Sequence, residues 1–448
     1  MSRFVRASKY RHVYGTPNKR DACFDGLKIS KNAWDTNLVK ANPKFISVNL
    51  EAGGGGSFAV IPHEKTGKLE GLPVVNVLDT DFHPFNDNIV ASASEDCTVK
   101  LWSIPDEGLE ENLSTPVASF NSHGRKVGHV LWSPTAENLL ASASADFTVK
   151  LWDVSSGKEC TTLTGFGEVI QSLSFSWDGA LLATSCKDKK LRVFDIRANK
   201  VVQEVLGHPG VKGSRVGPLE KFASTGFSKT SDRQVSIWDA KNLSEPVKSE
   251  TIDTASGMLM PFFDECTSML YLAGKGDGNI RYYEWVDDDK GLYLLSEYKS
   301  SDPQRGLGFL PKRAVNVVDT EITRAFKVHV NMVEPISFKV PRKSDAFQSD
   351  LYPDCVGDKP SLTVDEFFAG QTRPPILISL EHGFTASATK EFSTTAPAPV
   401  VESIKGPQTE KEYQDAYHAL RKENDDLKNA VATRDARILQ LEAQLASK

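Results

Sequence analysis

The sequence has few cysteines, no long hydrophobic run and no apolar leader. Its six cysteines are scattered, with no C-x-x-C pair and no regular spacing, which argues against a disulfide framework and against a zinc site. This pattern favours reduced thiols in a cytosolic protein. No apolar stretch approaches the roughly 18 residues of a membrane-spanning helix, and the N-terminus lacks the apolar core of a secretory signal. We therefore expect no metal site, no disulfide and no transmembrane segment.

Motifs of common catalytic sites are also missing. Neither H-E-x-x-H nor G-x-S-x-G occurs in the chain. The glycine-rich stretch AGKGDGN (273–279) does not follow the G-x-x-x-x-G-K-[ST] pattern, so we interpret it as a hairpin turn rather than a phosphate-binding loop. These absences argue against an enzyme with a propeller active site, and we expect neither catalytic activity nor a cofactor.

Charge is unevenly distributed. The chain carries a net charge of −6, yet residues 1–31 hold eight Lys or Arg and two Asp, a local charge of +6. A basic arm on an acidic body favours an acidic partner surface, although a solvated edge or a transit peptide would have the same composition. A nucleic-acid binder is disfavoured because only this arm could contact phosphates.

Two nearly identical stretches, ASASEDCTVKLW (91–102) and ASASADFTVKLW (141–152), reveal an internal repeat. Three weaker copies follow, and in every copy an Asp precedes an aromatic residue by six positions. Successive Asp residues lie 50, 42, 44 and 45 positions apart, a period typical of four-stranded WD-repeat propeller blades. The Asp and aromatic pairs are Asp96 and Trp102, Asp146 and Trp152, Asp188 and Phe194, Asp232 and Trp238, and Asp277 and Tyr283.

We assign these residues structural roles. An Asp in the turn between two strands can accept backbone N–H bonds, and the aromatic residue that ends the next strand can pack between blades. His123 and His208 stand before the first strand of their blades, where we expect each to bond the turn Asp. A structural role is favoured over catalysis for all of them.

The repeat predicts an all-β fold, a seven-bladed propeller. Residues 44–77 supply a blade before the five copies, and residues 293–340, beginning with YLLSEY, supply a seventh. The N-terminal VRASKYRHV (5–13) is expected to add the last blade's missing strand and so remove the exposed edges. EAGGGGSFAV (51–60) resembles an engineered linker, but strand patterns on both sides favour a hairpin.

Composition divides the chain into four parts. We predict a propeller with its basic arm over 1–340, an extension packed on the propeller over 341–383, a variable flexible linker over 384–409 and an α-helical coiled coil over 410–448. A flexible linker of this length would have a root-mean-square span of roughly 25–30 Å.

The last forty residues follow a heptad pattern. Positions a and d are mostly apolar, and RILQLE (437–442) resembles the R-[ILVM]-x-x-[ILV]-E pattern of three-stranded coiled coils. We favour a homotrimer; Asn424 leaves a dimer or tetramer open, and a single helix packed on the propeller is the alternative. The residues expected to mediate self-association are Leu420, Asn424, Leu427, Val431, Arg437, Ile438, Leu441, Glu442 and Leu445.

Taken together, the sequence resembles the coronin family of actin-binding proteins. The resemblance covers nearly all of residues 1–382 and is most specific in the last three of its stretches. The matching stretches are SKYRHVYG (8–15), GGGSFAVIP (54–62), ASEDCTVKLW (93–102), GFSKTSDRQ (226–234), LAGKGDGNIRYYE (272–284), PQRGLGFLPKR (303–313) and VPRKSDAFQSDLYPD (340–354).

The resemblance implies binding to filamentous actin (F-actin), contact with the actin-related protein complex that nucleates branches, and a place in the cytoplasm, cytoskeleton and cell cortex. It also implies that Lys28, in CFDGLK (23–28), contributes to filament binding, where animal members often have Arg. We add Arg3, Arg6, Lys9 and Arg11 as candidates because actin filaments are acidic. Residues 70–79 lack a Gly-His loop usual in the family. The rival hypothesis is a generic WD-repeat scaffold that binds peptides on its top face.

Overall fold

Short runs of β-branched and apolar residues form the strands, and the polar stretches between them form turns. Strand β13 (Leu139–Ser144) is buried along its whole length, because both of its edges and both of its faces are covered. The outer strand of the same sheet, β15 (Lys158–Leu163), exposes its first residues to solvent. Each sheet therefore has a buried interior and a solvated outer edge.

The computed structural model describes 7–31, 36–52, 55–69, 71–72, 75–76, 78–210, 212–217, 221–288, 291–343, 346–385, 392–395, 418, 421–422 and 428. The chain divides into two units, Met1–Pro399 and Val400–Lys448. The described residues of the second unit, His418, Arg421, Lys422 and Lys428, are helical. The nine residues expected to mediate self-association lie outside the described residues, so the coiled coil stays a prediction.

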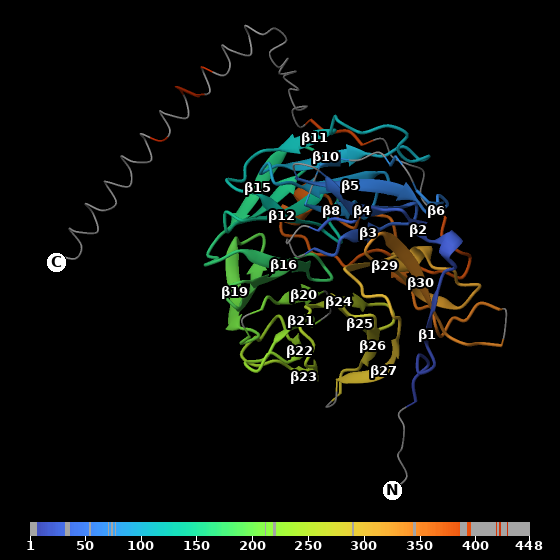
Figure 1. Cartoon of the computed structure of the whole chain (residues 1–448). Helices are drawn as coiled ribbons and strands as arrows, with labels where there is room; N and C mark the ends of the chain where they lie inside the picture. Colours follow the sequence, from blue (N-terminus) through green and yellow to red (C-terminus); the bar gives the residue numbers. More distant parts are fainter. Residues whose placement is uncertain are drawn as a thin grey trace. The chain divides into compact units, whose positions relative to one another are not determined.

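Seven sheets of four or more strands form the described part of the first unit, which confirms the predicted propeller (Figure 1). Blade 1 contains β3 (Val39–Ala41), β4 (Phe45–Ala52), β5 (Gly55–Pro62) and β7 (Val75–Asn76). Blade 2 contains β8 (Asp79–Phe82), β9 (Ile89–Ala93), β10 (Val99–Ser103) and β11 (Ala118–Phe120). Blade 3 contains β12 (Val127–Trp132), β13, β14 (Val149–Asp153) and β15.

The next three blades repeat the same order. Blade 4 contains β16 (Ile170–Phe175), β17 (Leu181–Cys186), β18 (Lys190–Asp195) and β19 (Lys200–Leu206). Blade 5 contains β20 (Arg215–Gly217), β21 (Phe222–Phe227), β22 (Arg233–Trp238) and β23 (Lys248–Asp253). Blade 6 contains β24 (Leu259–Asp264), β25 (Met269–Gly274), β26 (Ile280–Trp285) and β27 (Leu292–Tyr298).

Blade 7 joins the two ends of the propeller sequence. Its first three strands are β28 (Gly306–Phe309), β29 (Glu321–Val328) and β30 (Met332–Lys339), and its outer edge is β1 (Tyr14–Pro17) followed by β2 (Phe24–Asp25). The short 3-10 helix η1 (Arg20–Ala22) separates these two strands, and β6 (Gly67–Lys68) pairs with β2 in parallel. Ring closure by the N-terminal segment is thus confirmed.

Two details of the predicted blades were wrong. The closing strand is formed by Tyr14–Pro17 and Phe24–Asp25 rather than by 5–13, because Tyr10 and Val13 are buried beneath the ring instead of pairing at its edge. The YLLSEY stretch belongs to β27, the outer strand of blade 6, since it pairs with β26. The glycine-rich hairpin at 51–60 is confirmed by the pairing of Ala52 with Gly55.

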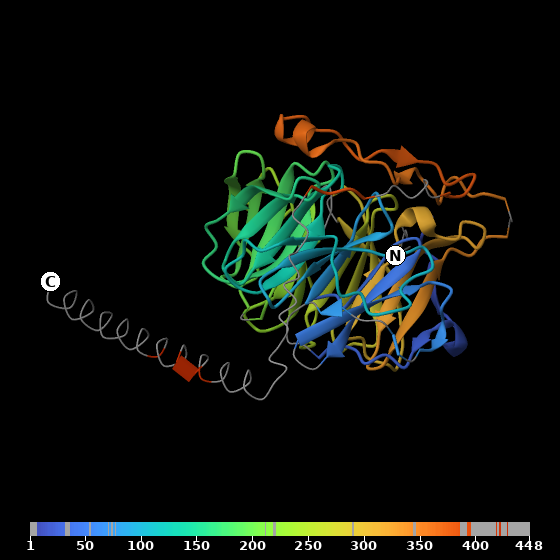
Figure 2. The same cartoon turned by 90° about the horizontal axis from the view of Figure 1, so that it is seen from above.

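The two ends of the strands define two faces, which we call top and basal. The top face carries the turns between the second and third strands, such as those with Asp96 and Asp146. The basal face carries the turns between the first and second strands, such as that with Thr135. A strap, residues 346–383, lies across this basal face, as Figure 2 shows in orange.

The strap is held by its own small elements and by two hydrophobic clusters. It contains β31 (Cys355–Val356), α1 (Val364–Phe368) and β32 (Leu377–Ile378), and Thr363 and Glu366 form a capping box at the start of α1. Leu351 and Tyr352 pack under blades 6 and 7, whereas Leu362 and Phe367 pack under blades 3 and 4. The strap therefore bridges opposite sides of the ring.

Part of the predicted linker also contacts the propeller. Phe392 packs against the apolar cluster of blades 2 and 3. The Thr394 hydroxyl donates to the carbonyl of Val154 at 2.9 Å, and the Thr395 amide donates to the carbonyl of Ser155 at 2.8 Å. Within the range predicted as flexible, these four residues are docked on blade 3.

All six cysteines are free. No helix among the described residues is long and apolar enough to cross a membrane. In the same residues no cluster of His, Cys, Asp and Glu has the arrangement of a metal site.

Candidate functional site

A hydrogen-bonded chain in blade 3 holds the repeat residues together. Trp152 Nε1 donates to Ser142 Oγ at 2.8 Å, Ser142 Oγ lies 2.8 Å from His123 Nε2, and His123 Nδ1 lies 2.9 Å from an Asp146 carboxylate oxygen. Burial lowers the pKa of His123, so the ring is neutral at pH 7 and carries one proton. That proton satisfies Asp146, which confirms the predicted His–Asp bond in this blade.

The same Ser, His and Asp have the connectivity of a catalytic triad, but they cannot act as one. Ser142 is completely buried, and its oxygen already accepts the Trp152 indole N–H. A nucleophile must reach a substrate carbonyl, and this one has neither access nor a free lone pair directed at solvent. The arrangement is structural, as the sequence predicted.

The repeat residues differ from blade to blade. In blade 2, Trp102 donates to Ser92 Oγ at 2.8 Å, but Asp96 accepts from Thr98 and Lys100. The stretch 70–79 that leads into β8 contains no histidine. Blade 1 closes there with only the two-residue strand β7; 70, 73, 74 and 77 lie outside the described residues.

Blade 5 departs from the predicted pattern. His208 Nε2 lies 2.9 Å from Ser224 Oγ, and Trp238 donates to the same oxygen. The predicted bond from His208 to the turn Asp was wrong, because the turn is longer and the Asp232 carboxylate accepts from Ser228 and Thr230 instead.

This difference supplies a matched pair of variants. We expect Asp146→Ala to lower the free energy of unfolding by about 1–3 kcal/mol, because it removes the carboxylate acceptor of the buried His123 N–H and leaves only the Thr148 hydroxyl at 3.4 Å. Asp232→Ala should cost clearly less than Asp146→Ala, since no buried histidine depends on that carboxylate. Urea unfolding of both variants tests this. Equal losses would contradict it.

Blades 4 and 6 replace histidine with arginine. Asp188 accepts from Arg192 at 2.6 Å within blade 4. Asp277, in the turn of blade 6, lies 2.7 Å from the guanidinium of Arg233, which belongs to blade 5. The turn Asp of blade 6 therefore links two neighbouring blades.

Lys28 is presented by a rigid segment on the top face. The chain turns at Gly26, where φ is +82° and an added Cβ would lie 2.8 Å from the Leu69 carbonyl oxygen, so there is no room for a side chain. Leu27 and Ile29 are buried on either side of Lys28. The amide of Glu51 donates to the carbonyl of Lys28 at 2.7 Å, so the backbone is fixed while the side chain is exposed.

Two other cations near Lys28 are paired with carboxylates. Arg20 pairs with Asp25 at 3.0 Å, and Lys31 pairs with Glu51 at 2.9 Å. The hydrogen bond from Arg20 holds the pKa of Asp25 below its ordinary value. Among the described residues, the ammonium group of Lys28 makes no ion pair or hydrogen bond. The Lys28 side chain is thus available to an acidic partner.

The other predicted filament contacts are not gathered around Lys28. Lys9 donates to the carbonyl of Asp350 in the strap, and Arg11 lies on the same basal side. Strand β30 separates them from Lys28, since its two ends pair with Tyr14 and Asp25, about 23 Å apart at 3.3 Å per residue. Arg3 and Arg6 lie outside the described residues. The basic arm is therefore two surfaces rather than one.

Models of protein families match three parts of the chain. A domain of unknown function, DUF1899, matches residues 3–68, which contain the closing strand and Lys28. The G-beta WD-domain model matches 67–103, 114–153 and 157–195, and another type of WD40 repeat matches 333–375.

Relatives match nearly the whole chain. Coronin-A of Dictyostelium discoideum is 47% identical over 98% of this chain and 100% of its own length. Human Coronin-2A is 45% identical over 84% of this chain and 75% of its own length. The crystal structure of the WD40 domain from Toxoplasma gondii coronin has a TM-score of 0.78 and 33% identity, and covers 83% of this chain and 97% of that one. The chain belongs to the coronin family of actin-binding cytoskeletal regulators, which are not enzymes.

Proposed function

We propose that the top-face edge around Lys28 binds the acidic surface of an actin filament. The observation that carries this proposal is an exposed cation that has no partner among the described residues and is held on a segment whose neighbours on both sides are buried. Because the backbone is fixed before binding, little conformational entropy is lost when the contact forms. Arg20 and Lys31 lie nearby but are already paired with Asp25 and Glu51, so they add little net positive charge.

The remaining parts of the function concern assembly. We infer that the heptads of 410–448 make a trimer and that several propellers then bind one filament together. Contact with the branch-nucleating actin-related complex, and a place at the cell cortex, complete the proposed function. Family membership and the charge of the N-terminal segment support these steps.

Charge reversal at Lys28 tests the filament surface. We expect Lys28→Asp to weaken cosedimentation with actin filaments about tenfold at low salt, because one attraction becomes a repulsion. Lys229→Asp is the matched control: it reverses another exposed top-face lysine, in the turn between β21 and β22 of blade 5. The filament affinity of Lys229→Asp should stay near that of the unchanged protein.

Two further measurements complete this test. The thermal unfolding temperature of Lys28→Asp should not change, since the side chain has no partner within the described residues. Affinity of the unchanged protein should fall as salt is raised. Undiminished cosedimentation of Lys28→Asp would refute the assignment, and absence of binding by every protein would favour a generic scaffold.

A further inference from the structure

A cavity on the basal face combines aromatic rings with carboxylates. It has a volume of about 440 Å³, within the size range of ligand pockets. Two blade turns, the ends of β24 and β26 and the strap contribute to its wall, and no Lys or Arg is among the described residues that line it. The lining residues used below are Trp177, Phe263, Glu265, Cys266, Trp285 and Asp354.

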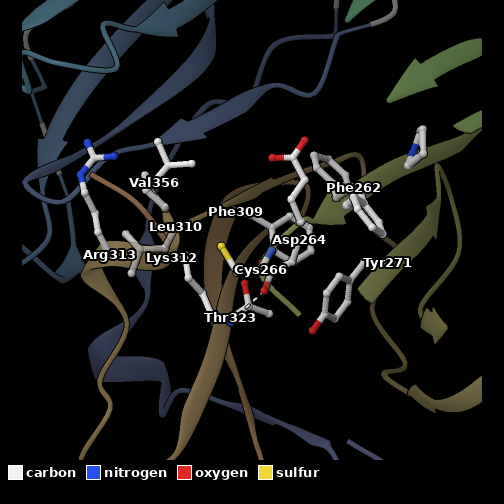
Figure 3. Close-up of a pocket in the computed structure, with 14 residues that line it drawn as sticks. Phe262, Asp264, Cys266, Tyr271, Phe309, Leu310, Lys312, Arg313, Thr323 and Val356 are labelled. Carbon is white, nitrogen blue, oxygen red and sulfur yellow. Dashed lines mark hydrogen bonds and ion pairs between the residues drawn. The ribbon is translucent and has the colours of Figure 1, made fainter. Parts of the chain in front are cut away.

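Glu265 is the unusual group in this cavity. Its neighbour Asp264 is neutralised by Lys312 at 2.8 Å, and the two face each other in the adjoining cavity (Figure 3). Among the described residues, the Glu265 carboxyl has neither an ion-pair nor a hydrogen-bond partner. Phe263, Glu265 and Cys266 line both cavities, so this carboxyl stands at the junction between them.

The aromatic rings around Glu265 are suited to a positive charge. Trp177 comes from the turn between β16 and β17 and belongs to none of the hydrophobic clusters formed by the described residues. Trp285, at the end of β26, already has the ammonium of Lys221 at 5.7 Å from its ring. A cation near a tryptophan face is attracted by the ring quadrupole, and most strongly when water is excluded.

We propose that this basal cavity binds an ammonium or guanidinium group, with Glu265 and Asp354 as counter-charges and Trp177, Phe263 and Trp285 as the rings around it. The shared chemistry is that of a basic side chain, carried either by a partner polypeptide or by a small organic cation. The site lies on the face opposite Lys28, so it would be free in a filament-bound molecule. It does not depend on the proposed filament contact.

The ionisation of Glu265 agrees with this arrangement. Burial, assisted by Asp264, raises its pKa to about 8, so the carboxyl is largely protonated at pH 7. A bound cation would favour the charged form, and binding should therefore tighten between pH 7 and pH 9. Burial raises the pKa of Cys266 to about 12, which keeps that thiol neutral over this range. The other charged or titratable groups lining the adjoining cavities are Lys40, Arg215, Asp264, Tyr271, Lys312, Arg313 and Asp354.

Tryptophan fluorescence of the full chain provides the test. N-acetyl-arginine amide should cause saturable quenching, and its uncharged isostere N-acetyl-citrulline amide should not. Glu265→Gln and Trp177→Ala should each weaken the arginine titration at least fivefold. Glu168→Gln, on the top face, is the matched control and should leave the affinity for the arginine amide unchanged.

The results of these titrations either support the proposal or overturn it. Equal quenching by the citrulline compound, or unchanged affinity in Glu265→Gln, would overturn the proposal. A thermal melt of each variant verifies that it is folded, and Glu265→Gln preserves side-chain shape. An arginine tripeptide that binds more tightly than the free amide would indicate a polypeptide ligand, whereas equal affinities would indicate a small cation.

Discussion

Replacement of Arg233 by methionine is expected to lower the free energy of unfolding by about 3–5 kcal/mol, the cost of breaking a buried ion pair on one side. Arg233 is 1% exposed. Its Nε and Nη2 atoms each lie 2.6 Å from Asp253, Nη2 lies 2.7 Å from Asp277, and Nη1 donates to the Gly257 carbonyl at 3.1 Å. Methionine keeps the apolar stem but leaves both carboxylates without this partner.

The geometry explains why the effect should spread beyond one blade. Asp253 ends β23 of blade 5, and Asp277 lies in the turn of blade 6, so one guanidinium joins two sheets. A side chain at Gly274 would approach both Arg233 and Asp277 to 2.1 Å, so glycine is needed there for close packing. Loss of Arg233 would weaken a blade interface as well as a local network.

Arg281→Ala is the control for this prediction. Arg281 also contacts Asp253, at 2.5 Å, but its side chain is 22% exposed and its loss uncovers no fully buried charge. We expect a cost of about 1 kcal/mol or less. Denaturant unfolding compares the two variants with the unchanged protein. A loss below 1 kcal/mol for Arg233→Met would show that water or rearrangement compensates the carboxylates.

The pH dependence has a definite sign. Burial alone would raise the pKa of Asp253, but hydrogen bonds from Arg233 and Arg281 outweigh it and hold the pKa well below its ordinary value. A depressed carboxyl pKa stabilises the fold above the unfolded-state pKa of about 3.9, and this contribution is lost as the pH falls towards the folded value. The difference in unfolding free energy between Arg233→Met and the unchanged protein should therefore persist from pH 7 to about pH 4 and shrink below pH 4.

The fold was largely predictable because the same physical unit recurs. A strand, a polar turn with Asp, and a strand that ends in an aromatic residue are local patterns, and their period sets the blade. Which strand completes a neighbouring blade is not local. YLLSEY follows a turn and precedes a strand in either assignment, and only its pairing with β26 places it in blade 6.

Lys28 could be singled out from the sequence, but the residues that share a surface with it could not. Lys28 is exposed on the top face, whereas Lys9, which belongs to the same basic segment of the sequence, lies on the basal face. An extended strand carries the chain about 3.3 Å per residue, so a charged segment that contains strands cannot remain one patch. The Arg233 network was missed as well, although SDRQ (231–234) places Arg immediately after the turn Asp.

The docked residues shorten the predicted tether between the propeller and the coiled coil. Because residues 392–395 are docked on blade 3, the part of the predicted linker between them and the predicted coiled coil is 396–409. A flexible chain of that length has a root-mean-square span of about 20 Å instead of 25–30 Å. A shorter tether raises the effective concentration of the second propeller, provided that it still spans neighbouring filament sites.

Leu441→Asp is expected to abolish the oligomer and to lower apparent filament affinity by about 10²–10⁴-fold, because avidity is lost while each propeller is unchanged. Leu441 occupies a d position in the heptads, where a carboxylate would be buried among apolar side chains. Gln440→Asp is the matched control, since position c faces solvent in the same register. Light scattering should give three times the 49.2 kDa chain mass for the control and one chain mass for Leu441→Asp. A trimeric Leu441→Asp would disprove the register, and a monomer that binds filaments undiminished would disprove the avidity mechanism.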